Sequence, residues 1–212
     1  SSHPTTATYD SAFTVNNPSK SVSVSFSLGS SGGSATTTTI TKAYAFTGWK
    51  ITGMDSVTHT YGSSTTTNTS ISSTKATSFK NLLCNPGTVN FLALWSPPTI
   101  TLPTVTKTGY TCKWKSDSYE WSSGGSYTPD ASGGATARTM TASCTPIIYT
   151  ISLDKQSGSG GTGTIYEKYN AGWYSNSGAT SSISSVTVPS RTGYTFGGYY
   201  TSTGGSGTQI IN

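Results

Sequence analysis

The amino-acid sequence predicts a mainly β protein, arranged as a tandem array of three small β-sandwich-like modules with little helix. An aromatic phrase recurs at Lys42–Trp49, at Lys107–Trp114 and at Arg191–Tyr199, and such recurrence indicates repeated structural units. Each copy joins a basic residue, small residues and closely spaced aromatic residues, with Cys replacing one ring in the second copy. Strand-favouring Thr, Tyr and Val are abundant, whereas the strong helix formers are scarce.

The composition excludes several classes of protein. Only 9% of the 212 residues are charged, against about 25% in an average soluble protein, which is unusual for a cytosolic enzyme. With 13 Tyr, 5 Trp and 6 Phe, the chain has more aromatic residues than disordered chains contain. The 12 basic residues form no run, so no nucleic-acid partner is expected. No apolar run reaches the roughly 18 residues that a membrane span needs.

Residues 1–20 are predicted to be an extended N-terminal strand, because apolar residues alternate along it. The residues that share its apolar face are Ala7, Tyr9, Phe13 and Val15. The chain starts at Ser1 rather than Met, which fits a secreted protein whose signal peptide was removed, or a trimmed chain.

The first repeat is assigned to residues 21–95 and carries a long insertion. Strict alternation of apolar residues and Ser predicts a strand at Val22–Leu28. Within the insertion we expect a short strand around Val57–Tyr61 and a short helical turn at Ser78–Leu83. The apolar segment Val89–Trp95 is predicted to close the repeat as a strand.

The second repeat, residues 96–147, lacks an obvious first strand and closes with the predicted strand Thr139–Cys144. Cys112 and Cys144 occupy positions where other repeats carry large aromatic residues, so both are expected to point inward. A disulfide between them is favoured, because a small module gains most from a covalent link. The alternative is two reduced, buried thiols. Cys84, in a turn, is expected to be free.

The third repeat, residues 148–212, is predicted to contain strands at Tyr149–Leu153, Thr164–Tyr169 and Gly172–Tyr174. Its phrase strand, Tyr194–Phe196, is expected to place both rings on one face. The sequence ends before any closing strand comparable with those of the first two repeats. An unpaired edge beside an apolar groove is therefore expected here.

The segment Pro189–Tyr200, followed by 201–212, resembles the Listeria–Bacteroides repeat, also called the internalin B-repeat family. The same pattern occurs at Lys107–Trp114 and, with its Gly-Tyr pair lost, at Lys42–Trp49, so the resemblance covers residues 21–212. It implies β-grasp-like modules of secreted or cell-wall bacterial proteins that serve as stalks or parts of adhesins. The resemblance brings no catalytic residues with it.

Residues for chemistry are sparse, and no catalytic site, metal site or cofactor is predicted. The seven acidic residues are dispersed, and the Gly-rich loop at 157–163 lacks the Lys-Ser/Thr of a phosphate loop. A set of aromatic residues near the third phrase is a candidate sugar-binding platform, although a small β module also needs such rings for its core. The set comprises Trp173, Tyr174, Tyr199 and Tyr200.

These observations predict an extracellular structural protein of a bacterial surface, and not an enzyme. Two forms of this function remain open. The chain is either a segment of a stalk or adhesin, or a pilus-like filament subunit whose N-terminal strand completes the third repeat of the next copy, head to tail. A module that binds a host glycan or protein is the alternative from another functional class.

Overall fold

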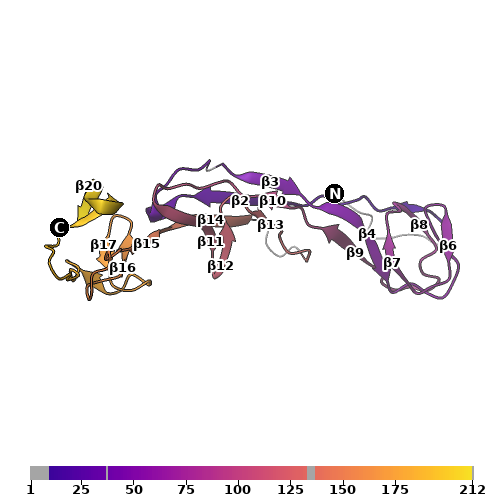
Figure 1. Cartoon of the computed structure of the whole chain (residues 1–212). Coiled ribbons are helices and arrows are strands. Elements are labelled where there is room, and N and C mark those ends of the chain that lie inside the picture. The colour runs from indigo at the N-terminus through magenta and orange to yellow at the C-terminus, as the bar shows by residue number, and fades with distance from the viewer. Residues whose placement is uncertain (1–9, 37, 133–136, 212) are drawn as a thin grey trace. The chain divides into compact units, whose positions relative to one another are not determined.

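The computed structural model describes residues 10–36, 38–132 and 137–211 (Figure 1). The described residues are mainly β, as predicted, and contain no α-helix. Two short 3-10 turns are present, η1 (Gly29–Ser31) and η2 (Thr203–Gly205). In this part of the chain, no helix combines the length and the hydropathy needed to cross a membrane.

The chain forms two compact units. The first is drawn from Ser1–Ser30, Ala35–Val105 and Lys113–Ser143, and the second from Ser31–Ser34, Thr106–Cys112 and Cys144–Asn212. The units do not follow the three predicted modules, because each unit takes segments that are distant in sequence.

Two small sheets share one hydrophobic core in the first unit, which is a sandwich-like arrangement. One sheet has the order β1 (Phe13–Thr14), β8 (Ser78–Lys80), β5 (His59–Tyr61), β6 (Ser64–Thr66), and the other has the order β7 (Ser70–Thr74), β4 (Ala45–Thr52), β9 (Asn90–Ser96). Their common core contains Val15, Trp49, Ile51, Met54, Ile71, Phe79 and Leu82. Burial of these side chains is the main force that holds the two small sheets together.

The helical turn expected at Ser78–Leu83 is wrong, because Ser78–Lys80 forms strand β8. Phe79 pairs with Phe13 on one side and with Tyr61 on the other. The Phe79 ring is 1% exposed. Tertiary packing of this ring, rather than local propensity, decides the conformation of the segment.

The first phrase and the segment predicted to close its repeat are neighbours. β4 pairs antiparallel with β9 from Ala45–Ser96 to Thr52–Asn90, with a shift in register between Phe46 and Gly48. This shift is a β-bulge, which Gly48 permits through its φ of +146°. The predicted closing strand of the first repeat is therefore present.

A five-stranded sheet has the order β12 (Tyr119–Ser122), β11 (Tyr110–Ser116), β14 (Ala137–Pro146), β2 (Ser21–Ser27), β3 (Ile40–Ala43). A two-stranded sheet, β10 (Ile100–Thr101) and β13 (Ser126–Tyr127), is separate from it. The Trp114 ring is fully buried, and its indole N–H donates a hydrogen bond of 2.7 Å to the carbonyl oxygen of Pro103.

Strand β2 belongs to the sheet of the second repeat, although its sequence precedes the first phrase. It pairs in parallel with β14, with Ser23 opposite Ala137 and Ser27 opposite Thr141. The rings of Phe26 and Trp114 are 5.0 Å apart in an edge-to-face contact. The second repeat, which lacked a first strand of its own in the sequence, is completed by this strand from outside residues 96–147.

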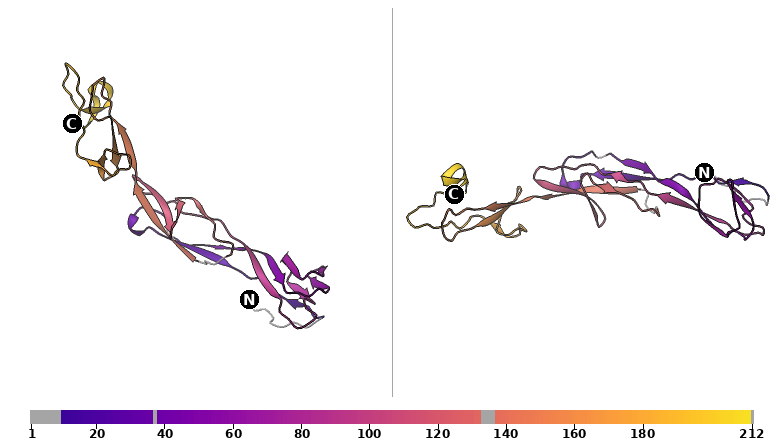
Figure 2. Two further views of the ribbon diagram at one scale, coloured as in Figure 1. Left: turned by 90° about the horizontal axis from the view of Figure 1, so that it is seen from below. Right: turned by 45° about the vertical axis from the view of Figure 1, so that its right-hand side comes forward.

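In the second unit, one sheet has the order β15 (Ile148–Ser152), β16 (Thr164–Lys168), β17 (Gly172–Tyr174), β18 (Ser182–Ile183). A separate hairpin consists of β19 (Tyr199–Ser202) and β20 (Ser206–Ile211), coloured yellow in Figure 2. Leu153, Ile165 and Tyr199 form a small core, against which Trp173 and Phe196 pack.

The strand expected at Tyr194–Phe196 is absent. Tyr194 makes only an isolated bridge to Arg191, and residues 195–198 have no strand assignment. The corresponding strands of the first two repeats, β4 and β11, each lie beside a closing strand, β9 or β14. A strand does follow the third phrase, but β20 reaches only its last residue, with Ile211 opposite Tyr199. Among the described residues no strand pairs with 194–198, so this backbone has nothing to extend against.

Candidate functional site

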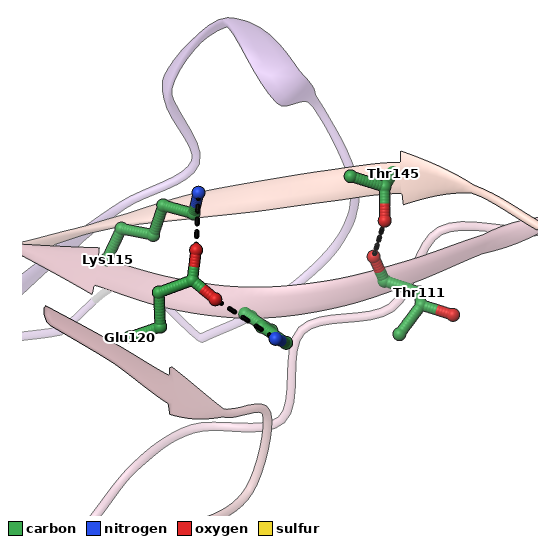
Figure 3. A network of polar contacts seen from close by, with 5 residues as sticks. Thr111, Lys115, Glu120 and Thr145 are labelled. Atoms are coloured by element: carbon green, nitrogen blue, oxygen red, sulfur yellow. Dashed lines mark hydrogen bonds and ion pairs between the residues drawn. The ribbon is translucent and has the colours of Figure 1, made fainter. Parts of the chain in front are cut away.

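A disulfide joins Cys112 on β11 to Cys144 on the neighbouring strand β14, with an S–S distance of 2.02 Å. This is the pairing that the sequence favoured over two reduced thiols. Cys112 is 8% exposed. Close by, the Thr145 hydroxyl donates a hydrogen bond of 3.4 Å to the carbonyl oxygen of Thr111 (Figure 3). The covalent link therefore fixes two strands that the second repeat needs to form its sheet.

Charged side chains lie on the outward face of β11. Lys113 and Lys115 alternate with the buried residues Cys112 and Trp114, and both contact Glu120 of β12, at 3.0 and 2.6 Å (Figure 3). Lys115 first, and then Lys113, hold the pKa of the Glu120 carboxyl below its usual value. These exposed pairs contribute little to stability, and they keep an edge of the sheet polar.

The predicted donor strand lies partly outside the described residues. Ala7 and Tyr9 belong to the part that the structure does not describe. Phe13 and Val15 pack into the core of their own chain, where the Phe13 ring lies 5.9 Å from that of Phe79 and Val15 is 6% exposed. These two side chains are thus not available for donation without opening that core.

The predicted aromatic platform does not form an exposed surface. Tyr199 is 8% exposed and its ring lies 5.1 Å from Phe196, edge to face, while Trp173 packs against the same core. Burial raises the pKa of the Tyr199 hydroxyl. The Tyr174 and Tyr200 hydroxyls donate to the nearby carbonyl oxygens of Ala171 and Gly197. Two of the four predicted rings thus serve the core.

Cys84 is free and exposed, as expected, and it contacts Asp55. The Asp55 carboxylate accepts hydrogen bonds from the Cys84 backbone N–H at 2.8 Å and from its thiol at 3.1 Å. The hydrogen bond to Asp55 raises the pKa of the Cys84 thiol, so the thiol stays protonated near neutral pH and is a weak nucleophile.

The nearby His59 is fully buried, and its Nδ1 donates a hydrogen bond of 2.8 Å to the carbonyl oxygen of Asn81. Within the described ranges, no group of three or more His, Cys, Asp or Glu residues is placed to hold a metal ion. The first unit therefore offers a structural hydrogen-bond cluster around the Cys84 turn.

The exposed apolar side chains of the second unit gather in its third-repeat sequence. Tyr194 is 67% exposed, Val188 49% and Ile210 48%. The sequence predicted an unpaired edge in this repeat, but it predicted Tyr194 to face the same side as Phe196. Phe196 instead packs against the core while Tyr194 points to solvent.

Sequence reasoning missed the partner of β2. Alternation along Val22–Leu28 identified the strand, but a period of two carries no information about which distant strand lies beside it. The one available signal was the absence of a first strand in residues 96–147.

Comparison of the chain with protein families, with curated proteins and with solved structures gives no match. The resemblance to the Listeria–Bacteroides repeat therefore stays a prediction.

Proposed function

We propose that this chain is an extracellular structural protein of a bacterial surface, a segment of a stalk or adhesin. In this proposal its small β-sheets are completed by strands that come from outside their own repeats. Small modules of this kind bury little surface, so they depend on added strands and covalent links for stability.

The observation that supports the proposal most strongly is the place of β2. It precedes the first phrase in the sequence, yet it pairs in parallel with β14 of the second repeat. Its side chains Val22 and Val24 are at most 1% exposed there. The disulfide between Cys112 and Cys144 lies on strands of the same sheet, and structural disulfides are typical of proteins outside the cytosol.

Filament assembly by strand donation is the second candidate, and a specific observation favours it. Tyr194 and residues 195–198 have no partner strand in the described part of the chain, so this segment is a place where a donated strand would pair. Burial of Phe13 and Val15 in their own core argues against the predicted donor. The stalk segment is therefore the better supported form.

Surface labelling tests the proposal. Antibodies raised against the oxidised chain should label intact cells of the source organism in immunogold electron microscopy, without permeabilisation. Labelling that requires permeabilised cells would overturn an extracellular role. Antibodies to a cytosolic protein of the same cells serve as the control for intact envelopes.

Light scattering on the full chain separates the two forms of the function. A stalk segment stays monomeric as concentration rises, whereas a strand-donating subunit forms growing polymers. If polymers form, Tyr9→Asp should abolish them, because a charge on the apolar face of a donated strand cannot be buried unpaired. Polymers that survive this substitution would exclude residues 1–20 as the donor.

A further inference from the structure

The second unit contains an open surface pocket of about 660 Å³, lined mostly by exposed residues; its volume lies within the size range of small-ligand sites. Its wall includes Ser157, Ser159, Pro189, Ser190, Arg191 and Tyr194. The Gly-rich loop after β15 supplies one side, and the segment that starts the third phrase supplies the other. Backbone hydrogen bonds of 2.8 and 2.9 Å run in both directions between Ser159 and Ser190, so the two sides are fastened together.

The glycines of the loop allow this close approach. Gly161 has a φ of +70°, and a Cβ atom there would lie 2.7 Å from the backbone nitrogen of Pro189. A Cβ atom at Gly158 would lie 3.2 Å from the Pro189 ring. A Cβ atom at Gly158 would also lie 2.9 Å from the carbonyl oxygen of Lys155. Backbone contacts this tight leave no room for a side chain at either glycine, so the loop and the segment Pro189–Ser190 form one built wall.

Arg191 brings a positive charge to the pocket, and its guanidinium forms no ion pair with an acidic side chain of the described residues. Its Nη1 donates one hydrogen bond of 3.0 Å to the carbonyl oxygen of Gln156. A guanidinium carries five N–H donors in a planar fork, so most of them are available to a ligand. Arg138, in the first unit, lies instead 3.7 Å from the carboxylate of Asp117.

Tyr194 adds an exposed aromatic face. Its ring is 67% exposed and lies 4.2 Å from the Arg191 guanidinium, in a cation–π contact. The remaining wall is rich in hydroxyl groups, from Ser157, Ser190 and Thr192, which both donate and accept hydrogen bonds. The pocket therefore combines one cation, one ring and several hydroxyls.

We propose that this pocket binds a carboxylated sugar, such as a uronic or sialic acid unit. The planar carboxylate matches the fork of Arg191, and the C–H face of a sugar ring packs on Tyr194. The serine and threonine hydroxyls suit the hydroxyls of the ligand. With a single Arg in its wall, the pocket suits one carboxylate better than a doubly charged phosphate. This site goes beyond a purely structural role and is separate from the predicted platform at Trp173.

Titration followed by ¹H–¹⁵N NMR on the full oxidised chain tests this site. The probes are methyl glucuronide and the methyl glycoside of N-acetylneuraminic acid, with methyl glucoside and acetate as controls. We expect saturable shifts at Ser157–Ser159 and Ser190–Tyr194 with a dissociation constant on the order of 1 mM. Methyl glucoside and acetate should bind at least about tenfold more weakly, because methyl glucoside lacks the carboxylate and acetate lacks the sugar ring.

Variants give the decisive comparison. Arg191→Gln should weaken binding at least about tenfold, as loss of a charge-assisted hydrogen bond does, and Tyr194→Ala should also weaken it. Tyr119→Ala is the matched control, because Tyr119 is 63% exposed but lies in β12 of the first unit. If the NMR spectrum shows that the Arg191→Gln variant is unfolded, Arg191→Lys replaces it in the test. Arg191→Lys keeps the positive charge but lacks the planar guanidinium fork, so it should still bind more weakly than the native chain.

Three results would overturn the proposal. They are the absence of saturable shifts with both acidic sugars at tens of millimolar, an equal response to acetate, and unchanged binding by the Arg191 and Tyr194 variants. An equal response to acetate would identify a general carboxylate site, of the kind that a peptide C-terminus would also fill.

Discussion

Gly48 and Gly198 occupy the same position in the first and third copies of the aromatic phrase, whereas the shorter second copy, Cys112-Lys113-Trp114, has no glycine there. Both have positive φ values, +146° and +113°, which side chains rarely adopt. The residue before each is free to vary, since it is Thr47 in the first copy and Gly197 in the third. Gly197 has no positive φ, and a Cβ atom there would meet nothing within 4 Å.

Replacing Gly48 should therefore be costly, whereas replacing Gly197 should not. A Cβ atom at Gly48 would lie 2.9 Å from the carbonyl oxygen of Thr74, in addition to the strain of its φ. We expect Gly48→Ala to lower the free energy of unfolding by about 1–3 kcal/mol, measured by urea denaturation. Gly197→Ala is the matched control and should change it by less than about 0.5 kcal/mol. Equal effects would refute the assigned role of the bulge.

Among the elements, β11 and β14 depend on their disulfide. The bond joins cysteines 32 positions apart, and closing a loop of that length stabilises a fold by about 3–4 kcal/mol in the chain-entropy account. We expect the double variant Cys112→Ser/Cys144→Ser to lose roughly this much in urea unfolding, and reduction of the native chain to act similarly. Cys84→Ser, at an exposed free thiol, is the control. A double variant as stable as the native chain would contradict this account.

At the level of strands, the sequence predicts part of this fold. Local alternation and the closing segments predicted strands that the structure contains, such as β2, β9, β14 and β16. Which strands are neighbours was not predicted, because the pairing of β2 with β14 joins residues more than a hundred positions apart. Such long-range contacts are absent from any local window.

The two wrong secondary-structure predictions also arise because the sequence does not show which strands are neighbours. The segment Ser78–Lys80 is a strand because Phe79 pairs with Phe13 and Tyr61, and Tyr194–Phe196 is not one because it has no neighbour. The candidate pocket could not be predicted from the sequence either. Its Gly-rich loop was visible in the sequence, but the bridge from Ser159 to Ser190 brings together segments whose proximity no sequence pattern indicated.

At the scale of the whole molecule, acidic pH should destabilise the folded protein more than the small number of charged residues suggests. Four carboxyls have their pKa held below the usual value, by Asn81 at Asp10, by the Cys84 backbone N–H at Asp55, by Lys115 at Glu120 and by the Ser132 backbone N–H at Asp130. A carboxyl with a depressed pKa in the folded state adds stability above its unfolded pKa and loses it as the pH falls.

The loss should therefore begin below about pH 4.5, where the ordinary values of 4.5 for Glu and 3.8 for Asp lie. We expect the thermal midpoint, followed by circular dichroism from pH 7 to pH 2, to stay nearly constant at first and then fall steadily. Asp55→Asn should flatten this fall, because it removes one of the protonation steps that acid couples to unfolding. A midpoint independent of pH down to 2 would contradict the assignment.

Added salt separates two contributions to this acid sensitivity, which are electrostatic interactions between exposed charges and short hydrogen bonds to carboxylates. Added salt screens the exposed contacts of Glu120 with Lys113 and Lys115, and it also weakens the repulsion among the positive charges left at low pH. It does not break the short hydrogen bonds that Asp55 accepts from the Cys84 backbone N–H, or Asp130 from that of Ser132. The part of the acid-induced loss that persists at about 0.5 M salt should therefore be the part that Asp55→Asn and Asp130→Asn reduce.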